Sequence, residues 1–305
     1  MKKVLIIGGT YFAGRVFAII ASQKGWDLSF INRGTYSMKY LGDVKEYKAD
    51  RRSAEMLTDF PCGEYDAIVD FCAYEPEDCS TLLRSLDVQT KQYILLSTAD
   101  VYDRSIRSLK DENTPLLESM GTGPAADYIW KKRNLEKEAA YACGILDIGL
   151  TILRPAFIYG PFNYAPRESF YVERIVKGQP IPVPADSDSE WNFVFVTDVA
   201  RAICACIEQQ SVSCGQAYNL SAPEIVTYES YMQTLKKITD RPFETRPVTV
   251  SEVLAQNIPL PFPLTADESE LFDGSRITRE LGTSYIPFEE GMQKAFNAFK
   301  PVFES

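Results

Sequence analysis

The chain has 305 residues, of which 45% are hydrophobic and 24% are charged, and its formal net charge is −10. This composition is ordinary for a globular protein, and the length allows one large domain together with a smaller lobe. The sequence contains no run of eighteen apolar residues and no Lys/Arg cluster that offsets the acidic charge, so we expect neither a membrane span nor a nucleic-acid partner.

Histidine is absent, and the seven cysteines contain no C-x-x-C pair. The lack of histidine argues against zinc sites and against His-based catalysis, so we expect no metal centre. The cysteine pattern indicates reduced thiols, most of them in the core, as is typical of a cytoplasmic protein. The apolar run near the N-terminus enters a glycine motif after four residues, which favours a buried strand over a signal peptide.

The first half of the chain alternates short apolar runs with helical stretches, which is typical of βαβ units and a parallel sheet. We predict strands at Lys3–Gly8, Leu28–Ile31, Val44–Ala49, Ala67–Phe71, Tyr93–Ser97 and Leu150–Arg154. Helices are predicted between them at Phe12–Lys24, Ser53–Thr58, Glu77–Ser85 and Ala125–Ala142.

After Gly160 the chain becomes rich in proline and loops. We predict that the segment Phe193–Glu208 (strand, then helix) and a strand at Ala217–Leu220 return to the sheet. The other predicted features are helices at Ser169–Lys177 and Tyr228–Thr239 and a Pro-rich loop at Pro259–Pro263. The expected fold is therefore α/β, a doubly wound parallel sheet with a smaller, interleaved C-terminal substrate lobe. In this division, residues 1–160 and 191–222 form the cofactor domain and residues 161–190 and 223–305 form the lobe.

A glycine-rich turn follows the first predicted strand and opens the first predicted helix. This context is the one that a dinucleotide fingerprint requires, because the pyrophosphate binds the exposed N–H groups at the helix start. The usual middle glycine, which lets the cofactor approach the backbone, is replaced by tyrosine. The alternative is a plain corner between strand and helix. The turn reads Gly8-Gly9-Thr10-Tyr11-Phe12-Ala13-Gly14.

The residues that follow the second and third strands bear on the choice of cofactor. Asn32-Arg33-Gly34 contains no acidic residue for a ribose 2′-hydroxyl and offers an arginine for a 2′-phosphate, which favours NADP over NAD. The same tripeptide is also an ordinary turn sequence. Asp50 and Arg51 either face the adenine or cap the helix that begins at Ser53.

Tyr128 and Lys132 are four residues apart, a spacing that places them on one face of a helix. An ammonium and a cationic cofactor ring near a phenol lower the phenol's pKa from about 10 toward neutral. Such a tyrosine can act as a general acid or base without histidine. Of the 17 tyrosines, Tyr128 alone has a lysine four positions later. An exposed helix pair would explain the spacing equally well.

Taken together, these motifs resemble the extended and atypical short-chain dehydrogenase/reductase superfamily, of the NAD-dependent epimerase/dehydratase type with a GGxxxxG turn. The resemblance extends over most of the chain, and its motifs are specific only jointly. Besides the glycine turn and Tyr128-x-x-x-Lys132, it rests on the segments Leu95–Tyr102, Leu153–Pro161 and Phe193–Ala200.

The resemblance implies a Rossmann-like domain that holds NAD(P) and a lobe that closes over a substrate. By position, Tyr128 would be the acid/base, Lys132 would bind the nicotinamide ribose, and Thr98 would hydrogen-bond the reacting group. The alternative for Thr98 is a hydroxyl that satisfies a backbone group at the strand end. Other implied cofactor contacts are Phe71, Cys72 and Ala73 after the fourth strand, and Pro155 and Ile158 on the nicotinamide side.

The sequence departs from the family pattern where a sugar-nucleotide diphosphate is usually bound. Trp191 occupies the place of one expected arginine, and dehydration is not favoured because only Asp100 of an acidic pair is present. Missing bidentate arginines would lose charge-assisted bonds worth about 1.5–3 kcal/mol each, so we expect a less anionic substrate. The candidate substrate residues are Asp100, Tyr164, Arg167, Trp191 and Phe262, although aromatic residues more often pack in a core.

Three classes of function remain open from the sequence. The expected one is an NAD(P)-dependent oxidoreductase or epimerase that acts on a sugar-like or small carbonyl or hydroxyl substrate. The second is a cofactor-binding regulatory or scaffold protein without turnover, and the joint presence of Thr98, Tyr128 and Lys132 argues against it. RNA binding is the third, and the acidic charge argues against it. By family analogy, the helix that carries Tyr128 is expected to form a homodimer contact.

Overall fold

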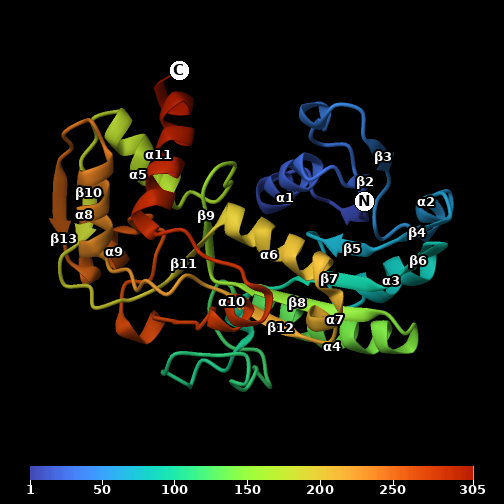
Figure 1. Cartoon of the computed structure of the whole chain (residues 1–305). Helices are drawn as coiled ribbons and strands as arrows, with labels where there is room; N and C mark the ends of the chain where they lie inside the picture. The colour runs from blue at the N-terminus through green and yellow to red at the C-terminus, as the bar shows by residue number, and fades with distance from the viewer. Residues whose placement is uncertain (305) are drawn as a thin grey trace.

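A seven-stranded parallel sheet forms the large domain of the computed structural model, which describes residues 1–304 (Figure 1). The strand order is β12-β8-β7-β5-β1-β2-β3, and every neighbouring pair is parallel. The strands are β1 (Lys3–Ile7), β2 (Asp27–Asn32), β3 (Lys45–Lys48), β5 (Ala67–Asp70), β7 (Gln92–Leu96), β8 (Gly149–Pro155) and β12 (Ala217–Leu220).

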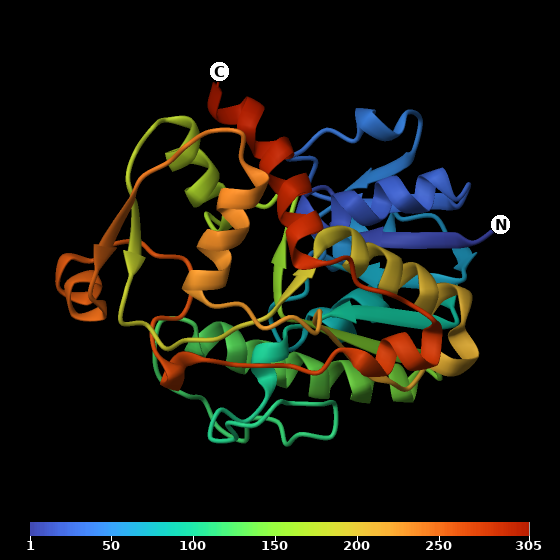
Figure 2. The same cartoon turned by 60° about the vertical axis from the view of Figure 1, so that its left-hand side comes forward.

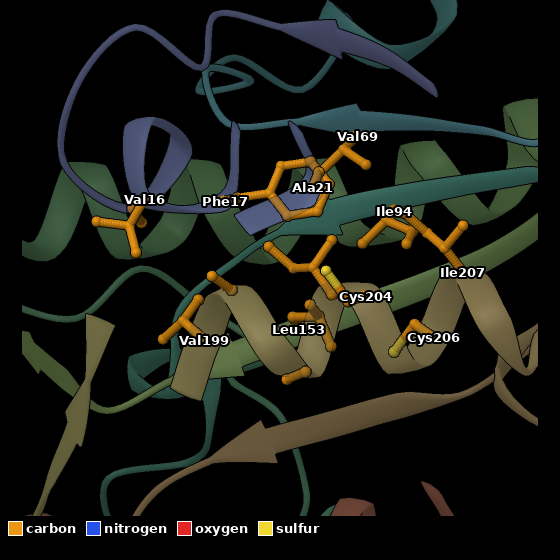
Figure 3. Packing of buried hydrophobic residues seen from close by; sticks show 14 of the residues in the cluster. Val16, Phe17, Ala21, Val69, Ile94, Leu153, Val199, Cys204, Cys206 and Ile207 are labelled. Atoms are coloured by element: carbon orange, nitrogen blue, oxygen red, sulfur yellow. The ribbon is translucent and has the colours of Figure 1, made fainter. Parts of the chain in front are cut away.

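Helices cover both faces of this sheet, which makes three layers. Apolar side chains of α1 and α6 pack with those of β5, β7 and β8 on one face (Figure 3). Side chains of α2, α3 and α4 pack on the other face. The helices of the large domain are α1 (Phe12–Gln23), α2 (Ala54–Thr58), α3 (Asp78–Ser85), α4 (Ala126–Ile145), α6 (Val196–Glu208), α7 (Gln210–Ser213) and α10 (Ser275–Leu281), with 3-10 turns η1 (Lys39–Leu41) and η2 (Ala99–Val101).

The second lobe stands beside the carboxyl ends of the strands (Figures 1 and 2). Its core is aromatic and includes Trp191, Tyr171, Tyr231 and Phe262. Its elements are α5 (Glu168–Val176), α8 (Tyr228–Ile238), α9 (Val250–Gln256), η3 (Ala266–Glu268), α11 (Phe288–Glu304) and the parallel pair β10 (Ile181–Pro184) and β13 (Thr245–Val248). Two further parallel pairs join β9 (Phe157–Tyr159) to β11 (Phe193–Phe195) and β4 (Gly63–Tyr65) to β6 (Val88–Thr90).

The predicted strands and helices of the first half are confirmed, with ends that differ by at most three residues. The prediction that the strand at Phe193 returns to the main sheet is wrong. It pairs with β9 in a separate two-stranded sheet, while Ala217–Leu220 does join the main sheet beside β8. An apolar run shows that a strand is buried but does not say which neighbour it pairs with. Helices α9, α10 and α11 were not predicted.

The hydrophobic cores assign some residues differently from the division proposed from the sequence. Phe193 and Phe195 pack in the core of the second lobe. Ile277 and Leu281 of α10 pack against α6 and the sheet, in the core of the large domain. Within residues 1–304, no helix combines the length and the apolar character needed to cross a bilayer.

Candidate active site

The strand order reverses beside β1, because the chain runs from β1 to β2 and β3 on one side and then continues at β5 on the other. Ligands of doubly wound sheets bind outside the carboxyl ends of the strands at such a point. A cavity of about 670 Å³ lies there, lined by the residues that follow β1, β2, β5, β7 and β8. It brings together segments that are as far apart in the sequence as Gly8 and Phe272.

The glycine-rich turn forms one wall of the cavity and leaves room for a ligand at the start of α1. Gly8 and Gly9 have φ of 78° and 71°, a left-handed conformation that glycine adopts without strain. A Cβ at Gly14 would lie 2.5 Å from the Cα of Gly9, so only glycine lets the helix approach the turn this closely. No side chain caps the first N–H groups of α1, which leaves them able to bind an anion.

Tyr11, which replaces the usual middle glycine, turns its ring toward other tyrosines. Its ring stacks on that of Tyr36, with centroids 4.8 Å apart, and lies 5.6 Å from that of Tyr164. Thr10 and Phe12 line the same wall, and the Phe12 ring meets Tyr164 edge-on. Three segments that are distant in sequence thus meet over the glycine turn.

At the end of β2, Asn32 forms a turn and Arg33 remains exposed beside the cavity. The Asn32 side-chain oxygen accepts a 2.6 Å hydrogen bond from the N–H of Gly34, as the turn interpretation expects. Asp50 lines the cavity and accepts a hydrogen bond from the N–H of Arg52. Arg51 also lines it, but its guanidinium is buried and lies 2.5 Å from Asp70.

The end of β5 carries a buried polar network. The Asp70 carboxylate also accepts hydrogen bonds from the hydroxyl of Tyr93 and, at 3.0 Å, from the N–H of Cys72. Burial raises the pKa of Cys72 to about 12, so this cavity residue is a neutral thiol. Phe71 and Cys72 line the cavity. Ala73 is buried and contributes its carbonyl oxygen to another site residue.

Lys132, whose ammonium bonds to the Ala73 carbonyl, reaches the cavity from α4 together with Tyr128. Its ammonium donates hydrogen bonds of 2.7 Å to the carbonyl of Ala73 and 2.9 Å to that of Leu96. The same nitrogen lies 4.8 Å from the ring centroid of Tyr74. Burial lowers the pKa of Lys132 to about 8. The helical spacing therefore does place both side chains at one site.

Taken together, the protein's own groups raise the pKa of Tyr128, contrary to the sequence-based expectation, although Arg167 opposes the rise. Burial first, and then the negative charge of Asp100, raise it above its ordinary value. Although 42% of the Tyr128 surface is exposed, the side chain is part of the cavity wall. Lys132 directs two of its donors at backbone carbonyls instead. In the absence of a ligand, Tyr128 thus holds its proton at neutral pH.

Thr98 lies at the end of β7 and caps the short turn η2. Its hydroxyl accepts a hydrogen bond from the N–H of Asp100 and donates one of 2.9 Å to the Asp100 carboxylate. This arrangement matches the alternative interpretation of Thr98 as a strand-end cap, while the residue also lines the cavity. Arg104 lies 3.7 Å from Asp100 and 4.0 Å from Glu270, so it bridges two acidic groups.

Some of the predicted substrate residues line the cavity and others do not. Asp100, Tyr164 and Arg167 line it, as do Pro155 and Ile158, which the resemblance assigns to the nicotinamide side. The Arg167 guanidinium stacks on the Phe157 ring and donates to the carbonyl of Ile158.

Trp191 and Phe262, in contrast, lie in the aromatic core of the second lobe. Their rings stack with centroids 5.0 Å apart, and neither lines the cavity. The prediction that they bind substrate is therefore wrong, and the alternative, that these aromatic residues pack in a core, is confirmed.

Several residues that line the cavity were not predicted. Tyr74 follows the predicted cofactor residues Phe71, Cys72 and Ala73 directly, so its position was the available signal. Others come from the segments after Asp100 and after Phe262, where the sequence shows no periodicity. They include Arg104, Pro263, Glu268, Glu270 and Phe272.

Comparison with known proteins identifies the family of the chain. The profile of the NAD dependent epimerase/dehydratase family matches residues 4–221 of the chain. The chain belongs to this family. This epimerase/dehydratase family member resembles the chloroplast stem-loop binding protein of 41 kDa b from Arabidopsis thaliana, with 27% identity over 250 residues. The match covers 77% of this chain and 63% of that protein, so the chain spans less than two thirds of its relative.

Solved structures of epimerases share the fold of this family member. UDP-glucose 4-epimerase of Thermotoga maritima, determined with UDP-glucose, is similar with a TM-score of 0.75 and 18% identity over 98% of this chain and 99% of that one. UDP-glucose 4-epimerase of Thermus thermophilus, in complex with NAD, is similar with a TM-score of 0.74 and 18% identity over 97% of this chain and 98% of that one. At this identity the similarity shows a common Rossmann-like fold.

Proposed function

We propose that this protein is an NAD(P)-dependent oxidoreductase or epimerase that uses Tyr128 as its acid/base in hydride transfer. Its substrate would be sugar-like, or a small carbonyl or hydroxyl compound. The observation that carries the proposal is that one cavity joins the glycine turn at the start of α1 to Thr98, Tyr128 and Lys132. A binding module would need the turn but not a phenol beside a buried ammonium.

The glycine turn fits a dinucleotide, because the Gly9–Gly14 contact brings the free N–H groups of α1 to the cavity wall. In the proposed assignment, Gly8–Gly14 hold the pyrophosphate and Lys132 holds the nicotinamide ribose. Phe71 and Cys72, at the end of β5, line the path between them. The bound dinucleotide would supply the hydride acceptor or donor.

Tyr128 would exchange a proton with the substrate oxygen while hydride leaves or reaches the carbon that bears it. With its pKa raised, the phenol is protonated at neutral pH and is ready to donate to a carbonyl. To accept a proton it must first lose its own, and a cationic nicotinamide ring would favour that loss. Thr98 would orient the substrate oxygen after exchanging its hydrogen bond to Asp100 for one to the substrate.

For the cofactor, we propose NADP in preference to NAD. The exposed Arg33 at the end of β2 is available for a 2′-phosphate, whereas Arg51 is engaged by Asp70. The family name and the Thermus thermophilus epimerase refer to NAD, so binding of both dinucleotides should be compared.

For the substrate, we propose a carbohydrate-like molecule with less negative charge than a nucleoside diphosphate. The cavity lining includes the carboxylates of Asp100, Glu268 and Glu270. Of the two nearby arginines, Arg104 is shared between two of these acids. Arg167 remains as the cation for an anionic substrate group.

The Tyr128→Phe variant tests the mechanism, because it removes the hydroxyl and keeps the ring. We expect it to bind NADP or NAD as the wild type does, with the same rise in Tm, and to lose hydride exchange with labelled cofactor by about 100-fold or more. Lys137→Met, a change on the same helix outside the cavity lining, is the control. Unchanged exchange in Tyr128→Phe would rule out the mechanism.

RNA binding is a second candidate, because the Arabidopsis thaliana relative is named as a stem-loop binding protein. The net charge of −10 opposes it, since binding to phosphates requires clustered cations. We propose instead that the protein has no nucleic-acid partner and works in the cytoplasm, where its seven free thiols would stay reduced. Retention of a stem-loop RNA on nitrocellulose at physiological salt would contradict this.

A further inference from the structure

We propose that Tyr74 is a positioning residue that holds the Lys132 ammonium in place beside Tyr128. The sequence motifs assign no role to Tyr74, and its side chain reaches the site from the loop between β5 and α3. Its contact with Lys132 is a property of the chain alone. Its importance for catalysis rests on the proposed function.

Three groups enclose the Lys132 ammonium. The carbonyls of Ala73 and Leu96 accept two of its hydrogen bonds, at 2.7 and 2.9 Å. The ring of Tyr74 forms the third side, with its centroid 4.8 Å from the nitrogen. An ammonium within about 6 Å of a ring centroid is attracted by the negative face of the ring. The ring therefore helps to fix the ammonium at the cavity wall.

The Tyr74 ring also reaches the other catalytic candidate. Its centroid lies 6.4 Å from that of the Tyr128 ring, with an interplanar angle of 47°. One side chain thus contacts both members of the Tyr128–Lys132 pair. Because the ammonium bonds to two carbonyls and not to the Tyr128 phenol, Tyr74 links the two groups.

The backbone of Tyr74 is held rigidly although its side chain is 44% exposed. The Asp78 carboxylate accepts hydrogen bonds from the N–H groups of Tyr74, at 2.8 Å, and Glu75, at 3.0 Å. Arg52 fixes that carboxylate with a 2.8 Å bond. An aromatic residue that leaves this much surface uncovered contributes little to the core. Its fixed position is better explained by the site that it faces.

The charge state of Lys132 depends on several groups around it. Burial lowers its pKa to about 8, the charges of Asp70 and Glu136 raise it, and that of Arg51 lowers it. The face of an aromatic ring favours the charged form of an amine. Removing the Tyr74 ring should therefore take away one of the interactions that stabilise the charged ammonium. The pKa of Lys132 should fall, so that the side chain becomes neutral at a lower pH.

The experiment is a pH titration of Lys132 by NMR of protein labelled at the lysine ε carbon, with Lys132→Arg identifying its signal. We compare wild type with Tyr74→Phe, Tyr74→Leu and Tyr141→Leu. The last variant is a control that removes an exposed tyrosine from α4, the helix that carries Lys132. We expect Tyr74→Leu to move the midpoint by about 0.5–1 pH unit toward lower pH. Tyr74→Phe keeps the ring and should titrate as wild type, as should Tyr141→Leu.

A midpoint in Tyr74→Leu that stays the same or rises would overturn the proposal, since added water around the ammonium would shift it upward. If Tyr74→Leu does not fold, Tyr74→Phe must still match wild type, and a changed midpoint there also overturns it. The titration requires neither cofactor nor substrate. Failure of the wild type to bind NAD or NADP in a thermal shift would therefore refute the proposed function without deciding the role of Tyr74.

Discussion

A phenol in a partly buried site beside a carboxylate resists losing its proton, and Tyr128 is in this position. The spacing of Tyr128 and Lys132 predicted correctly that both would line one site. It did not predict that the pKa of Tyr128 rises, because the rise depends on burial and on Asp100, which lies outside the helix that carries the pair. The sequence thus indicates which residues form the site, whereas tertiary contacts determine their charge states.

Asp100→Asn tests this electrostatic account. The amide oxygen can still accept the hydrogen bond from Thr98, but the negative charge is lost. We expect the pKa of Tyr128 to fall relative to wild type, as measured by NMR of protein labelled at the tyrosine ζ carbon, with Tyr128→Phe identifying the signal. Asp103→Asn removes a nearby charge that does not line the cavity and should leave the pKa unchanged. An unchanged or higher pKa in Asp100→Asn would show that burial alone raises it.

At the scale of elements, the junction of β1 and α1 is the part of the site that the sequence specified best. A strand, a glycine turn and a helix follow one another within residues 3–23, so local rules suffice to place them. The rest of the cavity depends on loops near Asp100, Tyr164 and Glu270. No local pattern brings these loops together, so the sequence alone does not separate core aromatic residues such as Trp191 and Phe262 from residues of the pocket.

Gly14→Ala tests the close approach of α1 to the turn. The added methyl would meet the Gly9 backbone at 2.5 Å, so we expect the free energy of unfolding to fall by about 1–3 kcal/mol. The thermal shift with NAD or NADP should also be lost. Gly144→Ala is a matched control, because its methyl meets nothing within 4 Å on α4 and should stabilise the helix by up to about 1 kcal/mol. Retained dinucleotide binding in Gly14→Ala would contradict the assignment of the turn.

The unpredicted C-terminal helix shows that a clear pattern can also be overlooked. Phe288, Met292, Ala295, Phe296 and Phe299 are buried on one face of α11, at the spacing that indicates an amphipathic helix. Pro301 lies in the last turn of the same helix. The signal was present in the sequence, in contrast to the pairing of β11 with β9, which required the tertiary structure.

At the scale of the whole molecule, a homodimer remains a prediction. The outer end of α4 exposes apolar side chains, with Tyr141 at 69%, Ile145 at 65% and Leu146 at 46% exposure. We expect sedimentation to show a dimer, and the Tyr141→Glu, Ile145→Glu double variant to be a monomer, because buried charges oppose association. Leu254→Glu, at an exposed position on α9, is the control. A double variant that remains a dimer would place the interface elsewhere.

The alternation of strands and helices in the sequence predicted the overall architecture. In the structure, the cavity lies where the strand order reverses beside β1, as expected for a doubly wound sheet. What the sequence left open is how the lobe contributes to the site. Arg167 and Tyr164 reach the cavity from the loop before α5, so substrate binding and the arrangement of the two parts of the chain are linked.

The most direct measurement is a crystal structure of the protein with NADP or NAD bound. We predict the pyrophosphate at the N–H groups that begin α1 and the Tyr128 hydroxyl facing the nicotinamide, with Lys132 at the ribose. A Tyr128 hydroxyl turned to solvent in that complex, or a glycine turn that binds neither dinucleotide, would contradict the account.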